Sequence, residues 1–192
     1  MKKIIFVIIL TIFFSVSVFA TDHSSNSIFI GFTFNIGTFS AGDNYGGSIF
    51  LGGSLFIDWL PNKNIGLSYG LETALFGGKK QENTIFGIPI IFRLGWHPHF
   101  LQFEKFNTFL LAKLGWGLGI WGDNLDEAST PSGIVCGFNF GANYTLNSNL
   151  RAYTEIGYNY YGFARNSNYP EYPLGYGSGK VYSSVGLTIN LF

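Results

Sequence analysis

Few side chains in this sequence are suited to acid–base or metal chemistry. The chain has three histidines, and two of them, His97 and His99, flank Pro98. A histidine beside a serine or a carboxylate would act as a general base, and a His-Pro-His spacing would offer two ligands to a metal ion. Because two histidines without a nearby carboxylate make an incomplete metal site, we interpret residues 97–99 as a surface turn. We expect no metal and no cofactor.

Other reactive residue types also lack the partners that chemistry requires. Asp123, Asp126 and Glu127 do not have the spacing of a calcium-binding loop, so we interpret them as a solvated acidic loop. Cys136 is the only cysteine, and no basic neighbour in the sequence would favour its thiolate. It cannot close an intramolecular disulfide, and we interpret it as a small apolar residue of a strand.

Charged residues of both signs are more informative, because they lie in segments that are otherwise apolar and rich in glycine. The six residues of this set are Asp58, Glu72, Arg93, Lys113, Arg151 and Glu155. A charge buried without a partner is costly, whereas an ion pair with further hydrogen bonds is tolerated. What these charges do therefore depends on the elements that position them.

The composition favours strands that contact an apolar solvent. Of the 192 residues, 47% are hydrophobic and only 11% are charged, too few for an ordinary soluble surface. A helical membrane protein would need runs of about 20 apolar residues, and no such run follows the N-terminus. The 26 glycines and the 19% of aromatic residues are typical of strands in which rings and backbones approach closely. The formal net charge of zero gives no sign of a nucleic-acid partner.

The first 20 residues form a separate unit. Lys2 and Lys3 precede an uncharged apolar stretch, residues 4–19, and Ala20 ends a sequence typical of signal-peptidase cleavage. We predict a signal peptide over residues 1–20 and a mature domain over residues 21–192. An uncleaved membrane anchor is the alternative, but the apolar stretch is short and polar residues follow it directly.

Eight segments of the remaining chain alternate between apolar residues and small or polar ones, as strands do. In residues 27–39, for example, Ile30 and Phe32 share one face, while Gly31 and Thr33 share the other. The eight segments are residues 27–39, 47–59, 65–76, 84–96, 107–121, 133–145, 150–161 and 180–192. Each has roughly the ten-residue length that a tilted strand needs to cross a bilayer.

The charges indicate which face of these strands meets the solvent. Nearly every charge within a strand shares the face of the glycines and serines, including all six of the set above. A soluble β-sandwich or lipocalin-like barrel, the alternative, would bury its bulky apolar residues and expose its charges. We therefore predict an all-β fold, an eight-stranded antiparallel up-and-down transmembrane β-barrel whose apolar face, including Cys136, contacts lipid.

The connections alternate between short turns and longer loops, as at the periplasmic and extracellular ends of such barrels. The short ones are residues 61–64, 97–105 and 147–149, and the long ones are residues 40–46, 77–83, 122–132 and 162–179. Outward aromatic residues near both ends predict two belts at the membrane interfaces. Trp59, Trp96 and Tyr144 would form the belt at the turns, and Trp116, Tyr158 and Tyr160 the belt at the loops.

The interior of an eight-stranded barrel is just wide enough for side chains. Six inward aromatic residues would fill much of it: Phe29, Phe56, Phe76, Phe109, Tyr153 and Tyr161. Counting along the hairpins places Glu72, Pro89 and Lys113 at about one height, with Arg93 lower and closer to Glu155. The six inward charges then form either an electrostatic plug or a gate whose pairs exchange to open a narrow conduit.

Four features together resemble a known family. They are the predicted signal peptide, residues 88–93 (IPIIFR), the glycine-studded residues 114–119 (LGWGLG) and the C-terminal Phe192. Nearly end to end, the mature chain resembles the small outer-membrane β-barrel proteins of the OmpA/OmpX and opacity type. In that family the terminal aromatic shares a face with the apolar residues before it. Here Leu187, Ile189 and Leu191 lie on the opposite face from Phe192, which is a departure from the pattern.

The resemblance implies a location in the outer membrane of a Gram-negative-type cell, contact with its lipid, and insertion by the barrel assembly machinery. Enzymes of this general shape place a histidine with a serine or an acidic residue at the extracellular rim. Because His97 and His99 fall in a predicted periplasmic turn, we expect no enzyme. Two functions stay open: a monomeric structural or surface-interaction barrel without a constitutive wide pore, and a narrow channel for small or hydrophobic solutes.

The last long connection, residues 162–179, is the candidate contact surface for a host or surface ligand. It is rich in aromatic residues and proline: Phe163, Tyr169, Pro170, Tyr172, Pro173 and Tyr176. Exposed rings bring contact area at a low entropic cost, which favours a role in binding. The alternative is that these rings fold back on the rim or lie among lipid headgroups.

Overall fold

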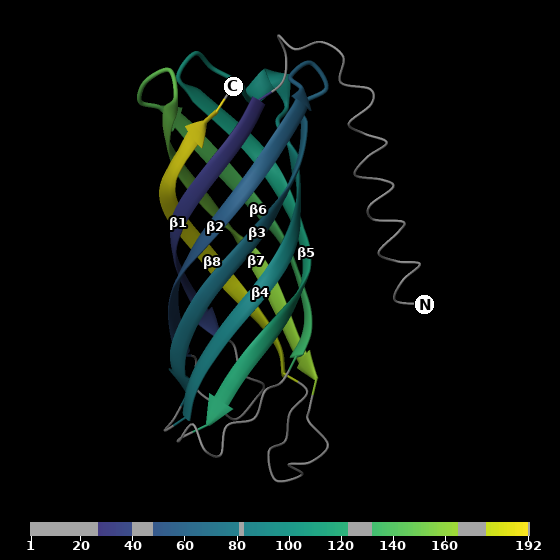
Figure 1. Cartoon of the computed structure of the whole chain (residues 1–192), viewed down its shortest axis with the longest axis vertical. Helices are drawn as coiled ribbons and strands as arrows, with labels where there is room; N and C mark the ends of the chain where they lie inside the picture. The colour runs from purple at the N-terminus through teal and green to yellow at the C-terminus, as the bar shows by residue number, and fades with distance from the viewer. Residues whose placement is uncertain (1–26, 40–47, 81–82, 123–131, 165–175, 192) are drawn as a thin grey trace, which may run out of the picture.

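The chain folds into a closed barrel of eight antiparallel strands, in a computed structural model that describes residues 27–39, 48–80, 83–122, 132–164 and 176–191 (Figure 1). The strands are β1 (Ser27–Phe39), β2 (Ser48–Asn62), β3 (Leu67–Lys80), β4 (Asn83–Trp96), β5 (Phe106–Gly122), β6 (Ser132–Thr145), β7 (Leu150–Ala164) and β8 (Tyr176–Asn190). Each strand pairs with the next, and β8 pairs with β1. The predicted fold class is confirmed, whereas the predicted signal peptide lies outside the described residues.

Several strand ends differ from the sequence prediction. β2 continues to Asn62, β3 and β4 pair as far as Lys80 and Asn83, and β7 and β8 pair as far as Phe163 and Tyr176. Ladder hydrogen bonds need only backbone groups, so a hairpin continues beyond the point where apolar alternation stops. The end residues of the predicted loops 77–83 and 162–179 therefore belong to paired strands.

Asparagine side chains close two of the short connections, which lie at one end of the barrel. In the turn between β2 and β3, Asn62 Oδ1 accepts the backbone N–H of Asn64 at 2.8 Å, and Gly66 has a φ of 70° that favours glycine. In the turn between β6 and β7, Asn147 Oδ1 accepts the N–H groups of Asn149 and Leu150 at 3.0 and 2.8 Å. The connection from β4 to β5 instead contains a short 3-10 helix, η1 (His99–Leu101). We call this the short-turn end.

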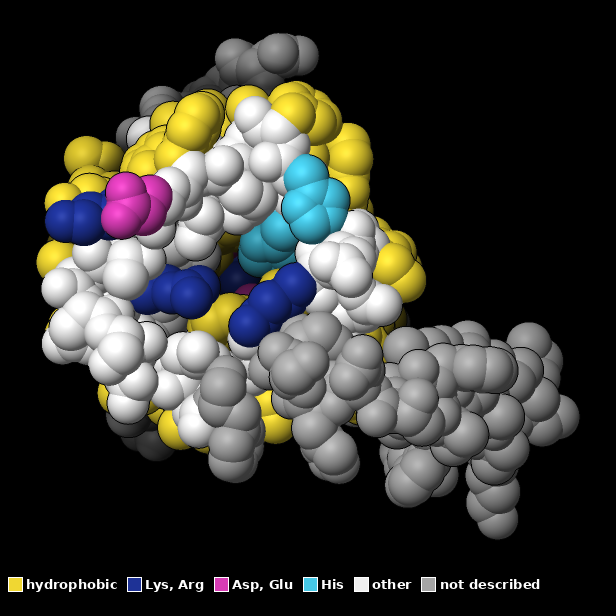
Figure 2. Space-filling view, turned by 90° about the horizontal axis from the view of Figure 1, so that it is seen from above, with side chains coloured by type: hydrophobic (Ala, Val, Ile, Leu, Met, Phe, Trp, Pro, Cys, Tyr) yellow, Lys and Arg dark blue, Asp and Glu magenta, His cyan; other side chains and the backbone are white. Residues whose placement is uncertain are grey.

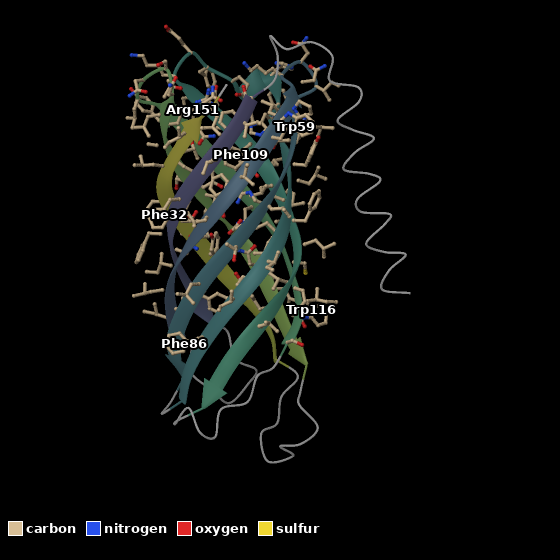
Figure 3. The ribbon with its side chains drawn as sticks, in the orientation of Figure 1. Phe32, Trp59, Phe86, Phe109, Trp116 and Arg151 are labelled. Carbon is tan, nitrogen blue, oxygen red and sulfur yellow. The ribbon has the colours of Figure 1, made fainter. Side chains whose placement is uncertain are left out.

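The barrel has its apolar side chains on the outside. Phe32, Phe86 and Trp116 point away from the barrel, whereas Phe109 points into it (Figure 3). Outward residues such as Ile90, whose exposed fraction is 66%, form a continuous apolar band around the strands. The alternation predicted from the sequence is therefore present, with the bulky apolar residues outside. Among the described residues, no helix is long and apolar enough to cross a membrane.

Two clusters of buried side chains fill the interior. One cluster consists of Phe50, Phe76, Ile91, Val135, Tyr161 and Tyr182. The other, nearer the short-turn end, consists of Phe56, Phe109, Leu111 and Tyr153. The inward glycines seat these rings: a Cβ at Gly87 would lie 2.2 Å from the Phe76 ring, and one at Gly141 would lie 2.1 Å from the Phe109 ring. Filled in this way, the lumen leaves little free space between the clusters.

Candidate functional site

Arg93 is the centre of an ion-pair network in the lumen. Its guanidinium Nε lies 2.9 Å from Asp58 Oδ1, and its Nη1 lies 2.5 Å from Glu72 Oε2. The same guanidinium lies over the Phe56 ring, 3.9 Å from the ring centroid. Arg93 and Glu72 are almost completely buried, so these contacts are screened little by water.

Lys113 continues the network to the other side of the lumen. Its Nζ lies 2.9 Å from Glu72 Oε2 and 2.5 Å from Glu155 Oε1, so Glu72 binds both cations. The Tyr153 hydroxyl accepts a hydrogen bond from Arg93 at 3.0 Å and donates one to Glu155. The network therefore runs without a break from β2 through β3, β4 and β5 to β7.

The structure brings together five of the six inward charges. The expected proximity of Glu72 and Lys113 is confirmed, since Lys113 Nζ lies 2.9 Å from Glu72 Oε2. Counting along hairpins placed Arg93 closer to Glu155, and this is wrong: Arg93 contacts Asp58 and Glu72, and reaches Glu155 only through Tyr153. Strands in a barrel are tilted and staggered, so a count along hairpins misplaces heights, and the long guanidinium reaches two neighbouring strands. Tyr153 was predicted only as a space-filling ring. Its place on the charged face, between Arg151 and Glu155, is the signal that was missed.

Arg151, the sixth charge, lies apart at the short-turn end (Figure 3). Its guanidinium carbon lies 4.9 Å from the centroid of the Phe29 ring, and no ion pair joins it to another described residue. Arg151 therefore does not belong to the network that crosses the lumen.

A cavity of about 200 Å³ opens at this end of the barrel. In Figure 2, which looks onto the short-turn end, Lys or Arg and His side chains surround a hollow. The lining includes Arg151, Lys63, His97, Phe29, Phe109 and Tyr153. Asp58 also lines it, so the network forms the inner boundary of the cavity. We call this space the short-turn cavity.

His97 lines the short-turn cavity. The sequence prediction that it belongs to a surface turn is therefore wrong. Its Nε2 lies 2.9 Å from Ser68 Oγ, and its ring centroid lies 5.4 Å from that of Phe109. The prediction failed because His97 directly follows β4 and keeps the inward direction of Arg93 and Gly95. His99 is exposed, with Nε2 2.5 Å from the Asn64 carbonyl oxygen. The described residues hold no cluster of three or more His, Cys, Asp or Glu side chains that would bind a metal.

Acidification is expected to destabilise the barrel through His97. Burial, together with repulsion from Arg151 and Arg93, lowers the pKa of His97 from 6.5 to about 4. Between these values the unfolded chain binds a proton that the folded chain does not, so stability falls as the pH drops through 6.5 and is constant above it. We expect a loss of up to about 3 kcal/mol by pH 4.

Urea titrations of the protein in lipid vesicles at several pH values measure this loss. The difference in unfolding free energy between the wild type and His97→Gln should shrink as the pH falls from 7 to 4. His99→Gln, in the same connection but exposed, is the control and should keep the wild-type dependence. If all three proteins lose the same free energy, the idea that His97 is responsible is wrong.

The aromatic residues of the two predicted belts lie on the outside, toward opposite ends of the barrel. Trp59 and Trp116 are labelled in Figure 3 near the short-turn end and toward the other end. Five of the six belt residues are exposed: Trp96, Tyr144, Trp116, Tyr158 and Tyr160. Trp59 is half-buried and packs against the Tyr69 ring. Phe100 and Phe103 add to the exposed aromatic residues at the short-turn end, with exposed fractions of 74% and 60%.

The candidate contact loop is shorter than predicted. Phe163 and Tyr176 are not loop residues, because they pair with each other at the ends of β7 and β8. Tyr169 and Tyr172 lie outside the described residues, as do His23, the acidic residues 123, 126 and 127, and Phe192. Cys136 is half-buried on the outward face of β6, between Leu114 and Tyr160 on the neighbouring strands.

No family model and no curated protein matches this sequence. Solved structures do have a similar fold. Neisserial surface protein A is 14% identical with a TM-score of 0.67, over 84% of this chain and 96% of that one. A major outer membrane protein from Thermus thermophilus is 14% identical with a TM-score of 0.52, over 84% and 99% of the two chains. The attachment invasion locus protein of Yersinia pestis is 12% identical with a TM-score of 0.51, over 87% and 98%.

These similarities confirm the predicted likeness to small outer-membrane β-barrels at the level of the fold. The finer likeness to the OmpA/OmpX and opacity type stays a prediction.

Proposed function

Because the chain has the fold of the small outer-membrane β-barrels, we propose that it is an outer-membrane protein with a structural or surface-interaction role and no constitutive wide pore. The closed network in the lumen supports this role: Asp58, Arg93, Glu72, Lys113 and Glu155 are linked across the barrel. Arg93 contacts the ring cluster on one side, at Phe56, and Lys113 lies 4.8 Å from the Tyr182 ring of the other cluster. Charges and rings at this level of the barrel thus support the absence of a wide aqueous path.

The rest of the proposal follows from the membrane location. The signal peptide, residues 1–20, exports the chain and is removed after Ala20, and the barrel assembly machinery inserts residues 21–192 as a monomer. Outer-membrane lipid covers the apolar band. The protein is not an enzyme, since no described histidine has a serine or carboxylate partner at the end opposite the short turns; His97 contacts Ser68, but inside the short-turn cavity.

Conductance of the refolded protein in a planar lipid bilayer tests the closed lumen. We expect no discrete conductance steps from the wild type, because the network would have to separate before ions pass. Lys113→Met, which removes one of its two cations, should give brief openings, whereas Lys105→Met at the exposed short-turn end should not. Steady wild-type conductance would instead support the alternative, a narrow channel for small or hydrophobic solutes. The short-turn cavity favours that alternative, because it would form the first part of such a channel at one end of the barrel.

The connection between β7 and β8 is the proposed contact surface. Support comes from its composition, with Tyr169, Pro170, Tyr172 and Pro173 among residues 165–175, and from the printed names of two proteins of similar fold, a surface protein and an attachment protein. Replacing residues 166–175 by a Gly-Ser linker should leave the barrel folded, as judged by a heat-modifiable gel shift. The same change should abolish adhesion of cells that display the protein to host matrix. Adhesion equal to that of the wild type would place the contact surface elsewhere.

A further inference from the structure

We propose that the short-turn cavity binds a small amphipathic carboxylate, a ligand with one carboxylate and a single ring or short apolar chain. The cavity combines two features that such a ligand needs. It has cationic groups without acidic partners, and it has walls made of aromatic rings. This inference rests on the cavity alone and not on the closed lumen.

The charge of the cavity favours an anion. Arg151 and Lys63 both line it, and neither forms an ion pair with a described residue. Asp58, the acidic residue of the lining, is already bound by Arg93 through three contacts between 2.9 and 3.2 Å. His97 also lines the cavity, where burial and then repulsion from Arg151 and Arg93 lower its pKa. A carboxylate would thus enter a site with two uncommitted cations.

Three polar side-chain atoms at and beside Arg151 are buried without a hydrogen-bond partner among the described residues. They are Arg151 Nε, Thr188 Oγ1 and Ser27 Oγ. Thr188 is the register partner of Arg151 on β8, and all three residues line the cavity. Buried polar groups are normally satisfied, so a guanidinium and two hydroxyls without partners form a set of donors suited to a carboxylate.

The walls and the volume define the rest of the ligand. Phe29, Phe56, Phe109, Tyr153 and Leu111 line the same space, so a purely inorganic anion would leave apolar surface uncovered. A volume of about 200 Å³ is below the roughly 300 Å³ at which pockets for drug-sized ligands begin. The site therefore fits one ring or a short chain and excludes a lipid or a peptide helix.

Calorimetric titration of the refolded protein in nonionic micelles tests the site with three probes. Benzoate carries the charge and the ring, benzyl alcohol carries the ring alone, and inorganic phosphate carries the charge alone. We expect saturable binding of benzoate and at least about tenfold weaker binding of the other two, because each lacks one of the two contacts. Empty micelles correct for partition of the probes into detergent.

Variants then locate the site. Arg151→Gln should weaken benzoate binding by about tenfold or more, and Arg151→Lys should retain part of it. Lys63→Gln, at an exposed turn position where the substitution should not disturb folding, should weaken benzoate binding by a smaller factor. Lys105→Gln, an exposed cation that does not line the cavity, is the matched control and should bind as the wild type does.

Three outcomes would overturn the proposal. They are no saturable benzoate binding to the folded wild type, equal binding of benzyl alcohol or phosphate, and benzoate binding that is unchanged in both Arg151→Gln and Lys63→Gln. None of these outcomes bears on the conductance test of the closed lumen, so the two proposals fail separately.

Discussion

Lys113→Met is expected to lose about 3 to 5 kcal/mol of unfolding free energy, the range found when one partner of a buried ion pair is removed. The network contains three carboxyl groups, Asp58, Glu72 and Glu155, but only two cations. With Lys113 gone, Arg93 alone faces the three carboxyl groups, and two of them lose a contact of 2.5 to 2.9 Å. The loss is measured by urea titration in lipid vesicles, with the exposed Lys105→Met as the control.

Because the network has three carboxyl groups and two cations, losing a cation should destabilise the barrel more than losing a carboxylate. Glu72→Gln leaves two cations facing two carboxylates, so it should cost less than Lys113→Met even though Glu72 contacts both cations. In the double variant Glu72→Gln, Lys113→Met, part of the Lys113→Met loss should be recovered, because the excess of negative charge becomes smaller. If the two losses simply add, or if Lys113→Met costs no more than Lys105→Met, the network does not stabilise the barrel as its geometry suggests.

The two faces of the strands were predictable because alternation is a local property. Each residue of a strand points to the face opposite from its neighbour, so Ile30 and Phe32 on one side of β1, and Gly31 and Thr33 on the other, could be assigned from their order alone. The position of the charges on the glycine face then distinguished a barrel in lipid from a soluble one. Neither step needed any knowledge of which strands lie side by side.

Contacts across the lumen were predictable only in part: Glu72 and Lys113 were placed at one height and do meet, but the partners of Arg93 were not found. Such contacts depend on the stagger between strands, which shifts the height of each residue relative to its neighbours around the barrel. This is why Arg93 was assigned to Glu155, although it contacts Asp58 and Glu72. The short-turn cavity was missed for a related reason. His97 was treated as part of a turn, whereas it continues the inward face of β4 and bonds to Ser68 on β3.

Replacing Ile90 with arginine on the outside is expected to cost about 2 to 4 kcal/mol, the range for a cation at the midplane of a bilayer. Ile90 lies in the middle of β4, between Thr73 of β3 and Trp116 of β5, and its exposed fraction is 66%. Because its side chain already faces away from the barrel, the arginine would disturb no packing inside the lumen. The loss of unfolding free energy would therefore measure the cost of placing the arginine in lipid and not a packing defect.

Ile65 provides a control that matches in residue type and exposure. It lies in the turn before β3, outside the strands, and its exposed fraction is 60%. Near the interface an arginine should cost only about 0 to 1 kcal/mol, because its head group can reach water. Unfolding titrations of both variants in vesicles, and again in a nonionic detergent, give the comparison. Equal losses for Ile90→Arg and Ile65→Arg in vesicles would contradict the position of the bilayer around the middle of the strands, since both side chains would then meet the same surroundings.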